Sequence, residues 1–258
     1  MTESLKAVIL RDRKIVTVSG TDRVKFLQGL MTNDIRRLAP DRTLYTGFLT
    51  GQGKLICDAF VMQDGDRILI DIAGADAKDF IARLSGFKLR EAVEIGETTA
   101  TLAVAAVWGT GATARLELDS AEGAVGSGAL AKAHLAFVDP RIAALGARLV
   151  YAADLPLEAE LARIGFAIAT PADYAGHRLV LGIADTAEIG GGVCYPLEAN
   201  FEMLHGVDFK KGCYIGQELT ARMKLKGELR KRILPVSGST PLPRTGTPVT
   251  ADGTELGP

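Results

Sequence analysis

The sequence is poor in cysteine, histidine and aromatic residues, and these shortages exclude several kinds of site. Three cysteines and three histidines occur among the 258 residues. Cys57, Cys194 and Cys213 form no Cys-x-x-Cys pair, which argues against a zinc knuckle, a thioredoxin-type redox pair and a disulfide framework. The histidines show no His-x-x-x-His spacing, so no mononuclear metal site is expected.

Two familiar glycine motifs are also missing. The 29 glycines form neither a Gly-x-Gly-x-x-Gly sequence after a strand nor a Walker loop, so a nucleotide cofactor has little support. The formal net charge is −1, without the basic excess of a general nucleic-acid binder.

Long hydrophobic runs are absent as well. The strongest apolar run, Leu102–Trp108, is far shorter than the roughly 20 residues that span a membrane. The first residues, 1–13, show no signal-peptide core and no transit-peptide character. The sequence therefore predicts a cytoplasmic protein that binds neither a membrane nor nucleic acid, and a monomer.

The most informative segment is Lys210-Lys-Gly-Cys-Tyr-Ile-Gly-Gln-Glu218. Glycines on either side of Cys213 allow tight turns or close approach of a ligand, because they carry no Cβ. Lysines and a following helix N-terminus favour a thiolate. Cys213 is therefore predicted to be a partly exposed reactive thiol supported by Lys210 and Lys211; the alternative is a buried structural cysteine.

The octapeptide from Lys211 to Glu218 resembles the signature of the YgfZ-type folate-binding proteins, relatives of the glycine-cleavage T-protein, an aminomethyltransferase. Segments 16–34, 139–148, 178–182, 195–200 and 206–212 are similar to that family in the same order. The resemblance covers most of residues 10–235.

The resemblance implies a function in iron–sulfur metabolism. It implies a tetrahydrofolate-binding accessory protein for assembly or repair of iron–sulfur clusters, with Cys213 as the working thiol. The resemblance thus implies tetrahydrofolate as the cofactor and allows transient binding of an iron–sulfur species. The expected partners are cluster assembly proteins or client iron–sulfur enzymes. Two alternatives stay open: a folate-dependent aminomethyl or one-carbon transferase, which would make the chain an enzyme, and a non-catalytic scaffold.

The pattern of strands and turns predicts an α+β fold. Strands are expected at 14–18, 44–49, 54–63, 67–72, 93–95, 101–107, 114–118 and 148–151, and helices at 21–31, 75–84, 158–168 and 172–181. Strands joined by hairpins indicate antiparallel sheets. Residues 121–131 are expected to form a loop or a weak helix.

The resemblance adds a domain division. Residues 1–232 are expected to form a folate-binding module with the T-protein cloverleaf, built from two interleaved α+β subdomains. Residues 233–258 would begin a C-terminal β-barrel, with strands at 233–236 and 247–250. A barrel needs more strands than this segment provides, so we expect it to be incomplete.

The second candidate centre is Asp58, in Gly53-Lys-Leu-Ile-Cys-Asp58. The corresponding T-protein strand carries two acids, and here Cys57 replaces the first. Asp58 is the candidate acid/base group or folate-ring acceptor; the alternative is an acid on the outer face of the strand. Cys57 and Cys213 are also candidates for close approach.

Further residues are predicted to hold the cofactor. They are Lys211, Gly212, Tyr214, Gly216, Gln217, Glu218, Glu198, Asn200 and Arg178. Glu198 and Asn200 have helix capping as their alternative. Asn33 is expected to act in a turn rather than on a ligand. The basic run 222–232 either forms a solvated face or attracts an acidic ligand tail.

Overall fold

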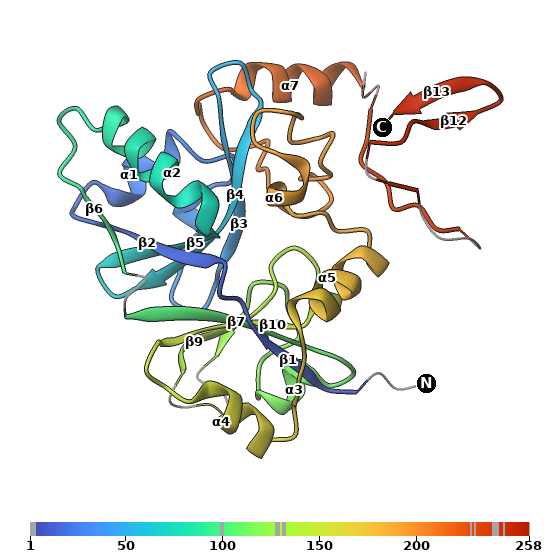
Figure 1. Cartoon of the computed structure of the whole chain (residues 1–258). Helices are drawn as coiled ribbons and strands as arrows, with labels where there is room; N and C mark the ends of the chain where they lie inside the picture. The colour runs from blue at the N-terminus through green and yellow to red at the C-terminus, as the bar shows by residue number, and fades with distance from the viewer. Residues whose placement is uncertain are drawn as a thin grey trace.

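The computed structural model describes residues 4–98, 101–126, 130, 133–227, 229, 231–238, 243, 244 and 246–257. It is a mixed α+β fold with two large sheets and a hairpin near the C-terminus (Figure 1). No helix in the described part of the chain is long and apolar enough to cross a membrane.

The first sheet has five antiparallel strands in the order β3-β4-β5-β2-β6. Its strands are β2 (Arg13–Ser19), β3 (Leu44–Leu49), β4 (Leu55–Asp64), β5 (Arg67–Ala73) and β6 (Glu94–Glu97). Helices α1 (Arg23–Gln28) and α2 (Gly74–Phe87) cover one face. Apolar side chains of the strands, including Val61 and Ile70, pack there against Leu27, Phe80 and Leu84. The strands are short apolar runs separated by turn residues, which explains why the sequence pattern predicts them well.

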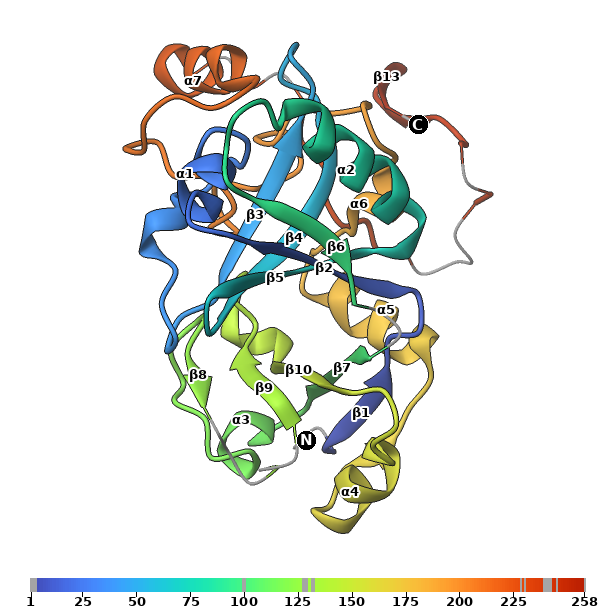
Figure 2. The ribbon, with the colours of Figure 1, turned by 90° about the vertical axis from the view of Figure 1, so that its left-hand side faces the viewer.

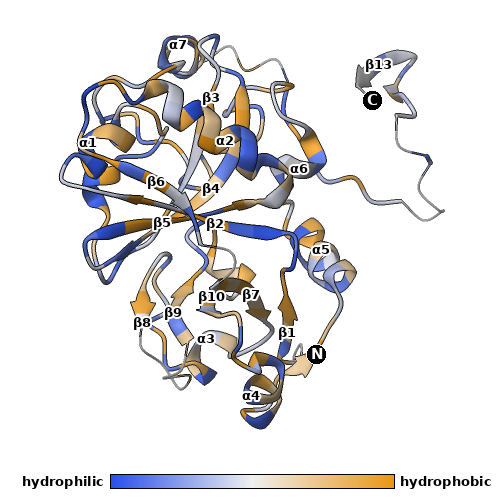
Figure 3. Ribbon diagram, turned by 60° about the vertical axis from the view of Figure 1, so that its left-hand side comes forward, coloured by the Kyte–Doolittle hydropathy of each residue, from blue (hydrophilic) through white to orange (hydrophobic). Residues whose placement is uncertain are grey.

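The second sheet has six strands in the order β11-β1-β7-β10-β9-β8. They are β1 (Lys6–Ile9), β7 (Leu102–Trp108), β8 (Val125–Gly126), β9 (Ala133–Val138), β10 (Ala147–Ala152) and β11 (Ala167–Ile168). Helices α3 (Ala112–Arg115) and α4 (Leu157–Arg163) pack on it through Leu116 and Leu161. Figure 3 shows hydrophobic residues along β1, β5 and β7.

The chain moves from one sheet to the other within a few residues, because β1 belongs to the second sheet and β2 to the first. Figure 2 shows the two sheets one above the other. A third core lies between them and includes Phe60, Trp108, Phe137 and Phe201. The strands of the two sheets thus alternate in blocks along the sequence.

The chain after the second sheet forms short helices and turns. Helices α5 (Pro171–Val180), α6 (Thr186–Ile189) and α7 (Gln217–Lys226) follow, and β12 (Val249–Ala251) pairs with β13 (Thr254–Gly257). Two 3-10 turns are η1 (Ile35–Arg37) and η2 (Ala143–Leu145). In Figure 1, α7 lies at the tip of β3 and β4.

Five local predictions are wrong or shifted. The segment predicted as a strand at 114–118 contains the end of α3, because Gly111 at φ +82° ends the extended chain and starts a helix. Residues 233–236 are not a strand, while the strand expected at 247–250 occurs as β12, shifted to Val249–Ala251. The helix predicted over 158–168 stops at Arg163, before Gly165 at φ +96°. Part of 121–131 forms β8, and residues 127–129 and 131 lie outside the described residues.

Candidate functional site

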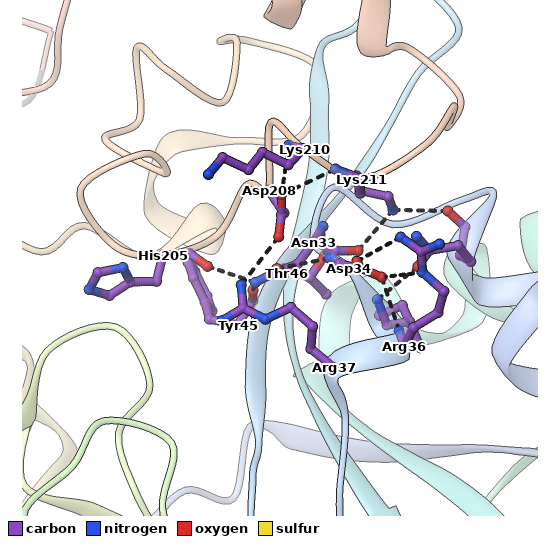
Figure 4. A network of polar contacts seen from close by, with 12 residues as sticks. Asn33, Asp34, Arg36, Arg37, Tyr45, Thr46, His205, Asp208, Lys210 and Lys211 are labelled. Carbon is purple, nitrogen blue, oxygen red and sulfur yellow. Dashed lines mark hydrogen bonds and ion pairs between the residues drawn. The ribbon is translucent and has the colours of Figure 1, made fainter.

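The cysteine motif lies on a loop, residues 205–216, that packs against the turn after α1. Lys211 is the central contact (Figure 4). Its Nζ donates to the carbonyl oxygens of Gln28 at 2.9 Å and Asn33 at 2.8 Å, and also to that of Met31. Burial lowers the pKa of Lys211 to about 8. The ammonium group is therefore committed to backbone carbonyls beneath the loop.

Asn33 and Thr32 bind the same loop from below. Asn33 Nδ2 donates to the carbonyls of Tyr45 and His205, each at 2.7 Å. Thr32 Oγ1 donates to the Gly206 carbonyl at 2.5 Å. Asn33 thus has the turn-fixing role that the sequence favours, and it connects the loop to β3.

Gly216 ends the loop where it meets the β3–β4 hairpin. It has φ +78° and forms the N-cap of α7. A Cβ built on Gly216 would lie 2.4 Å from the Thr50 carbonyl oxygen, and one on Gly53 would lie 2.8 Å from the Gly216 carbonyl oxygen. Both glycines are required by the contact of two backbones.

Gly212 and Cys213 form the open part of the loop. Both are exposed, and a Cβ on Gly212 would meet no described atom within 4 Å. The structure confirms the prediction of an exposed Cys213 and excludes the buried alternative. The fold itself therefore gives no steric reason for a glycine beside the thiol.

The two motif glycines provide a matched pair of substitutions. We expect Gly216→Ala to lower the free energy of unfolding by about 2 kcal/mol or more, because the Cβ clashes with backbone at a positive φ. Gly212→Ala should change it by less than about 0.5 kcal/mol. Urea unfolding of both variants measures the difference. Equal losses would contradict the assignment of Gly216 to the fold and Gly212 to the open surface.

The other motif residues shape the loop. Tyr214 is half-buried, this burial raises its pKa to about 12, and its backbone N–H donates to Gln217 Oε1 at 3.2 Å. Lys211 Nζ lies 4.8 Å from the centre of the Tyr214 ring. Glu218 is exposed in the first turn of α7, where an acid complements the helix dipole. Lys210 is exposed and is the motif lysine that faces solvent.

A cavity of about 560 Å³ lies beside the loop. Its lining includes Arg37, Arg42, His205, Asp208 and Lys210. His205 also pairs with Glu122 at 3.0 Å. The residues come from three distant parts of the sequence, so no local pattern could have predicted this cavity.

Asp58 is buried in β4 of the first sheet. It is 1% exposed, which excludes the alternative of an outward-facing acid. Thr186 Oγ1 donates to Asp58 Oδ1, while Oδ2 has no hydrogen-bond partner among the described residues. Burial, followed by the charge of Asp58, raises the pKa of Tyr45 well above its usual value. Asp58 is thus a carboxylate with one unused acceptor.

Cys57 points to the opposite face of β4. Its side chain is 0% exposed, in the core beneath α1 and α2, and burial raises the pKa of its thiol. Cys213 is exposed to solvent. Cys57 and Cys213 therefore do not share an accessible surface.

Arg178 lies in α5 beside a second cavity, of about 340 Å³. Its guanidinium pairs with Glu188 at 2.7 Å and donates to the Ile183 carbonyl at 3.2 Å. Tyr174 lines the same cavity, and its buried hydroxyl has no partner among the residues that the structure describes. Arg178 and Tyr174 thus form part of the cavity wall, and the Tyr174 hydroxyl is its unpaired polar group among the described residues.

Glu198 and Asn200 bind backbone groups. Glu198 Oε2 accepts the Tyr195 N–H at 2.8 Å, and Asn200 Nδ2 donates to the Ile233 carbonyl at 2.8 Å. Asn200 has φ +62° and also accepts from Arg232. These contacts attach residues 232 and 233 to the core. Of the basic run, Arg230 and Glu228 lie outside the described residues, and Arg222, Lys224 and Lys226 are exposed on α7.

The sequence missed a cluster of buried arginines between the two sheets. Asp71 accepts from Arg13 Nε at 2.7 Å and from Arg148 at 2.7 Å, and Arg141 pairs with Asp139 at 2.8 Å. The guanidinium carbons of Arg148, Arg141 and Arg13 lie 4.0, 4.8 and 5.6 Å from the centre of the Phe60 ring. Their strands are distant in sequence, so only tertiary structure brings them together.

Comparison with family models gives two matches. Residues 11–148 match the GCVT N-terminal domain. Residues 230–258 match the CAF17 C-terminal beta-barrel domain.

Comparison with curated proteins gives relatives along most of the chain. The chain is 35% identical to the iron–sulfur cluster assembly factor IBA57 homolog, mitochondrial, of Mycosarcoma maydis, with 87% of this chain and 55% of the relative covered. It is 32% identical to human IBA57, mitochondrial, with 96% and 72% covered. The chain spans little more than half the length of the first of these relatives.

These names correct one prediction. Relatives from fungi, a slime mould and human are named mitochondrial, which contradicts the expected cytoplasmic location. The expectation was wrong because it was taken from the first residues and composition, whereas address signals are separate from the folded part.

A solved structure shares the fold. The glycine cleavage aminomethyltransferase T of Bartonella henselae superposes with a TM-score of 0.70 at 13% sequence identity, with 87% of this chain and 64% of that chain covered. The mixed α+β arrangement with several sheets is therefore that of a T-protein.

Proposed function

Because the chain belongs to the IBA57/YgfZ/CAF17 family within the T-protein superfamily, we propose that it supports the assembly or repair of iron–sulfur clusters through the exposed thiol of Cys213. Its partners would be cluster assembly proteins or client iron–sulfur enzymes. The observation that carries the proposal is an open Gly212–Cys213 surface on an otherwise firmly held loop.

The thiol suits this work because of where it is placed. A thiolate can ligate iron or exchange with a partner's sulfur only if the partner can reach it. Gly212 leaves its backbone open to that approach, and Lys210, three residues before Cys213 in the sequence, provides an exposed positive charge on the same loop. A transient iron–sulfur species would be cargo bound at this surface.

Tetrahydrofolate is proposed as the small-molecule ligand. Asp58 Oδ2 and the Tyr174 hydroxyl are buried polar atoms without partners among the described residues, and a buried polar group without a partner costs free energy. A tetrahydropterin ring carries N–H groups, and a free carboxylate oxygen can accept hydrogen bonds from them. The cavity of about 340 Å³ beside Tyr174 and Arg178 is at the small end of the ligand-pocket range. When bound, the folate supplies a one-carbon carrier, and Arg178 would face its acidic portion. Asp58 does not itself line the cavity; Thr186, whose hydroxyl donates to Asp58, follows the lining residue Asp185, and from there Asp58 would orient the ring.

The motif residues would serve the thiol surface. Lys211, Tyr214 and Gly216 shape the loop, and Gln217 and Glu218 begin the helix that follows. Asn200 holds residues 232 and 233 against the core. Glu198 and Asn200 would therefore contact a ligand only on that side of the protein. Asn200 lines a further cavity there, of about 490 Å³.

We also propose a domain division. Residues 1–232 would form the folate-binding module, with the cloverleaf arrangement of the T-protein, and residues 233–258 the first part of a C-terminal β-barrel. The match of residues 230–258 to a barrel domain and the β12–β13 hairpin support the second part.

One observation favours a second function. The buried carboxylate of Asp58 retains a free oxygen, which is what a proton acceptor in one-carbon transfer requires. A folate-dependent aminomethyl transferase is therefore the alternative, and a non-catalytic scaffold is the third candidate.

Two substitutions separate these functions. Under the main proposal, Cys213→Ala abolishes support of iron–sulfur enzymes in complemented cells but leaves tetrahydrofolate affinity, measured by calorimetry, unchanged. Asp58→Asn should weaken folate binding about 10-fold or more, because it removes the charged acceptor.

If Cys213→Ala still supports iron–sulfur enzymes and Asp58→Asn does not, the transferase is favoured. Full support by both variants would leave only the scaffold. Wild-type folate affinity in Asp58→Asn would remove Asp58 from the ligand site without touching the role of Cys213.

A further inference from the structure

The ammonium group of Lys211 occupies a cage of carbonyl oxygens at the end of α1. Two of its three acceptors lie 2.8 and 2.9 Å from Nζ, and the residue is 9% exposed. Gln28 is the last residue of α1, where helix carbonyls lack intrahelical partners and form the negative end of the dipole, whereas Met31 and Asn33 belong to the turn after the helix. A compact ammonium with three donors fits such a cage, whereas a planar guanidinium does not.

The rest of the loop is held by backbone contacts on either side of Lys211. The Asp208 N–H donates to the Thr32 carbonyl at 3.1 Å, and the Ile215 N–H donates to the Gly29 carbonyl at 3.0 Å. Asp208 Oδ1 also accepts the Lys210 and Lys211 N–H groups, at 2.7 and 3.2 Å. Lys211 is thus the side-chain contact in the middle of a loop anchored at both ends, directly before Gly212 and Cys213 (Figure 4).

We infer that Lys211 is a positioning residue: its ammonium, bound to the carbonyls of Gln28, Met31 and Asn33, docks the loop and so fixes where Cys213 is presented. This inference rests on the proposed function only in taking Cys213 as the working thiol. It replaces the expectation that Lys211 supports the thiolate, because the lysine's three donors point into the cage.

The first test removes the ammonium and keeps the stem. In Lys211→Met, the amide hydrogens of Asp208 and Ile215 should exchange at least about 10-fold faster than in wild type, because the docked loop opens more often. The pH midpoint of Cys213 alkylation by iodoacetamide should stay where it is in wild type. Lys210→Met is the matched control: it loses the same charge at an exposed neighbour, and its amide exchange should equal that of wild type.

The second test refills the cage. Lys211→Ala leaves room for a small amine, so methylammonium or ethylammonium chloride should restore slow exchange of Asp208 and Ile215, while equal sodium chloride should not. If Lys211→Met does not fold, a rise in the urea midpoint of Lys211→Ala with added amine serves as the readout.

Two results would overturn the inference. One is unchanged exchange at both amides in Lys211→Met. The other is a shifted pH midpoint of Cys213 alkylation while the amides of Asp208 and Ile215 still exchange slowly. That result would mean that the lysine acts on the thiol. These readouts do not depend on iron–sulfur activity, so a failure of the proposed function, seen with Cys213→Ala, is distinguishable from a failure of the docking role.

Discussion

Replacing Asp71 by alanine is expected to lower the free energy of unfolding by about 3–5 kcal/mol. Both carboxylate oxygens are used: Oδ1 accepts from Arg13, and Oδ2 accepts from Arg148. The three side chains are 0%, 5% and 3% exposed for Asp71, Arg13 and Arg148. Alanine would leave two buried guanidinium groups without their shared counter-charge. Urea unfolding measures the loss.

An exposed ion pair supplies the control for Asp71. Asp79 pairs with Arg83 at 2.6 Å, one turn apart on α2, and the Asp79 side chain is 60% exposed. Asp79→Ala should cost less than about 0.5 kcal/mol. A loss in Asp71→Ala as small as in Asp79→Ala would mean that the arginine cluster does not hold the two sheets together.

The thiol of Cys213 is expected to react with iodoacetamide at least about a thousandfold faster than the thiols of Cys57 and Cys194 in the native protein. Cys213 is exposed and the other two are buried. A buried thiol reacts only when the chain opens, and open states have populations of about 10⁻³ or less. Burial also raises the pKa of both buried thiols, so less thiolate is present there.

Timed alkylation followed by peptide mass spectrometry resolves the three cysteines. In concentrated urea, the rates should become similar, which shows that the fold and not the local sequence protects Cys57 and Cys194. Native rates for Cys213 as slow as for Cys57 would remove the exposed thiol on which the proposed function depends.

Much of the first sheet could be predicted from short apolar runs bounded by turn residues. The strand predicted at 44–49 coincides with Leu44–Leu49, and that at 67–72 lies within Arg67–Ala73. Apolar runs and turn pairs such as Asp64-Gly65 are local properties of the chain, so the sequence carries them. The strand predicted at 114–118 failed because five residues carry too little pattern to distinguish a strand from a helical turn.

The candidate sites divide in the same way. The sequence singles out Cys213 and Asp58 by motif, and the structure adds that the first is exposed and the second is buried with a free oxygen. The sequence could not predict the contacts of Lys211, because a lysine near a cysteine in sequence can direct its long side chain elsewhere. Here the side chain reaches Gln28 and Asn33, far away along the chain.

The sequence alone determined the family resemblance, the α+β character and the unusual cysteine segment, since composition, alternation and short motifs are written in consecutive residues. Only the tertiary structure decided that Asp71 joins Arg13 and Arg148 between two sheets, and that a hairpin backbone requires Gly216. Contacts of this kind depend on the packing of distant segments, and local sequence does not encode the distances between them.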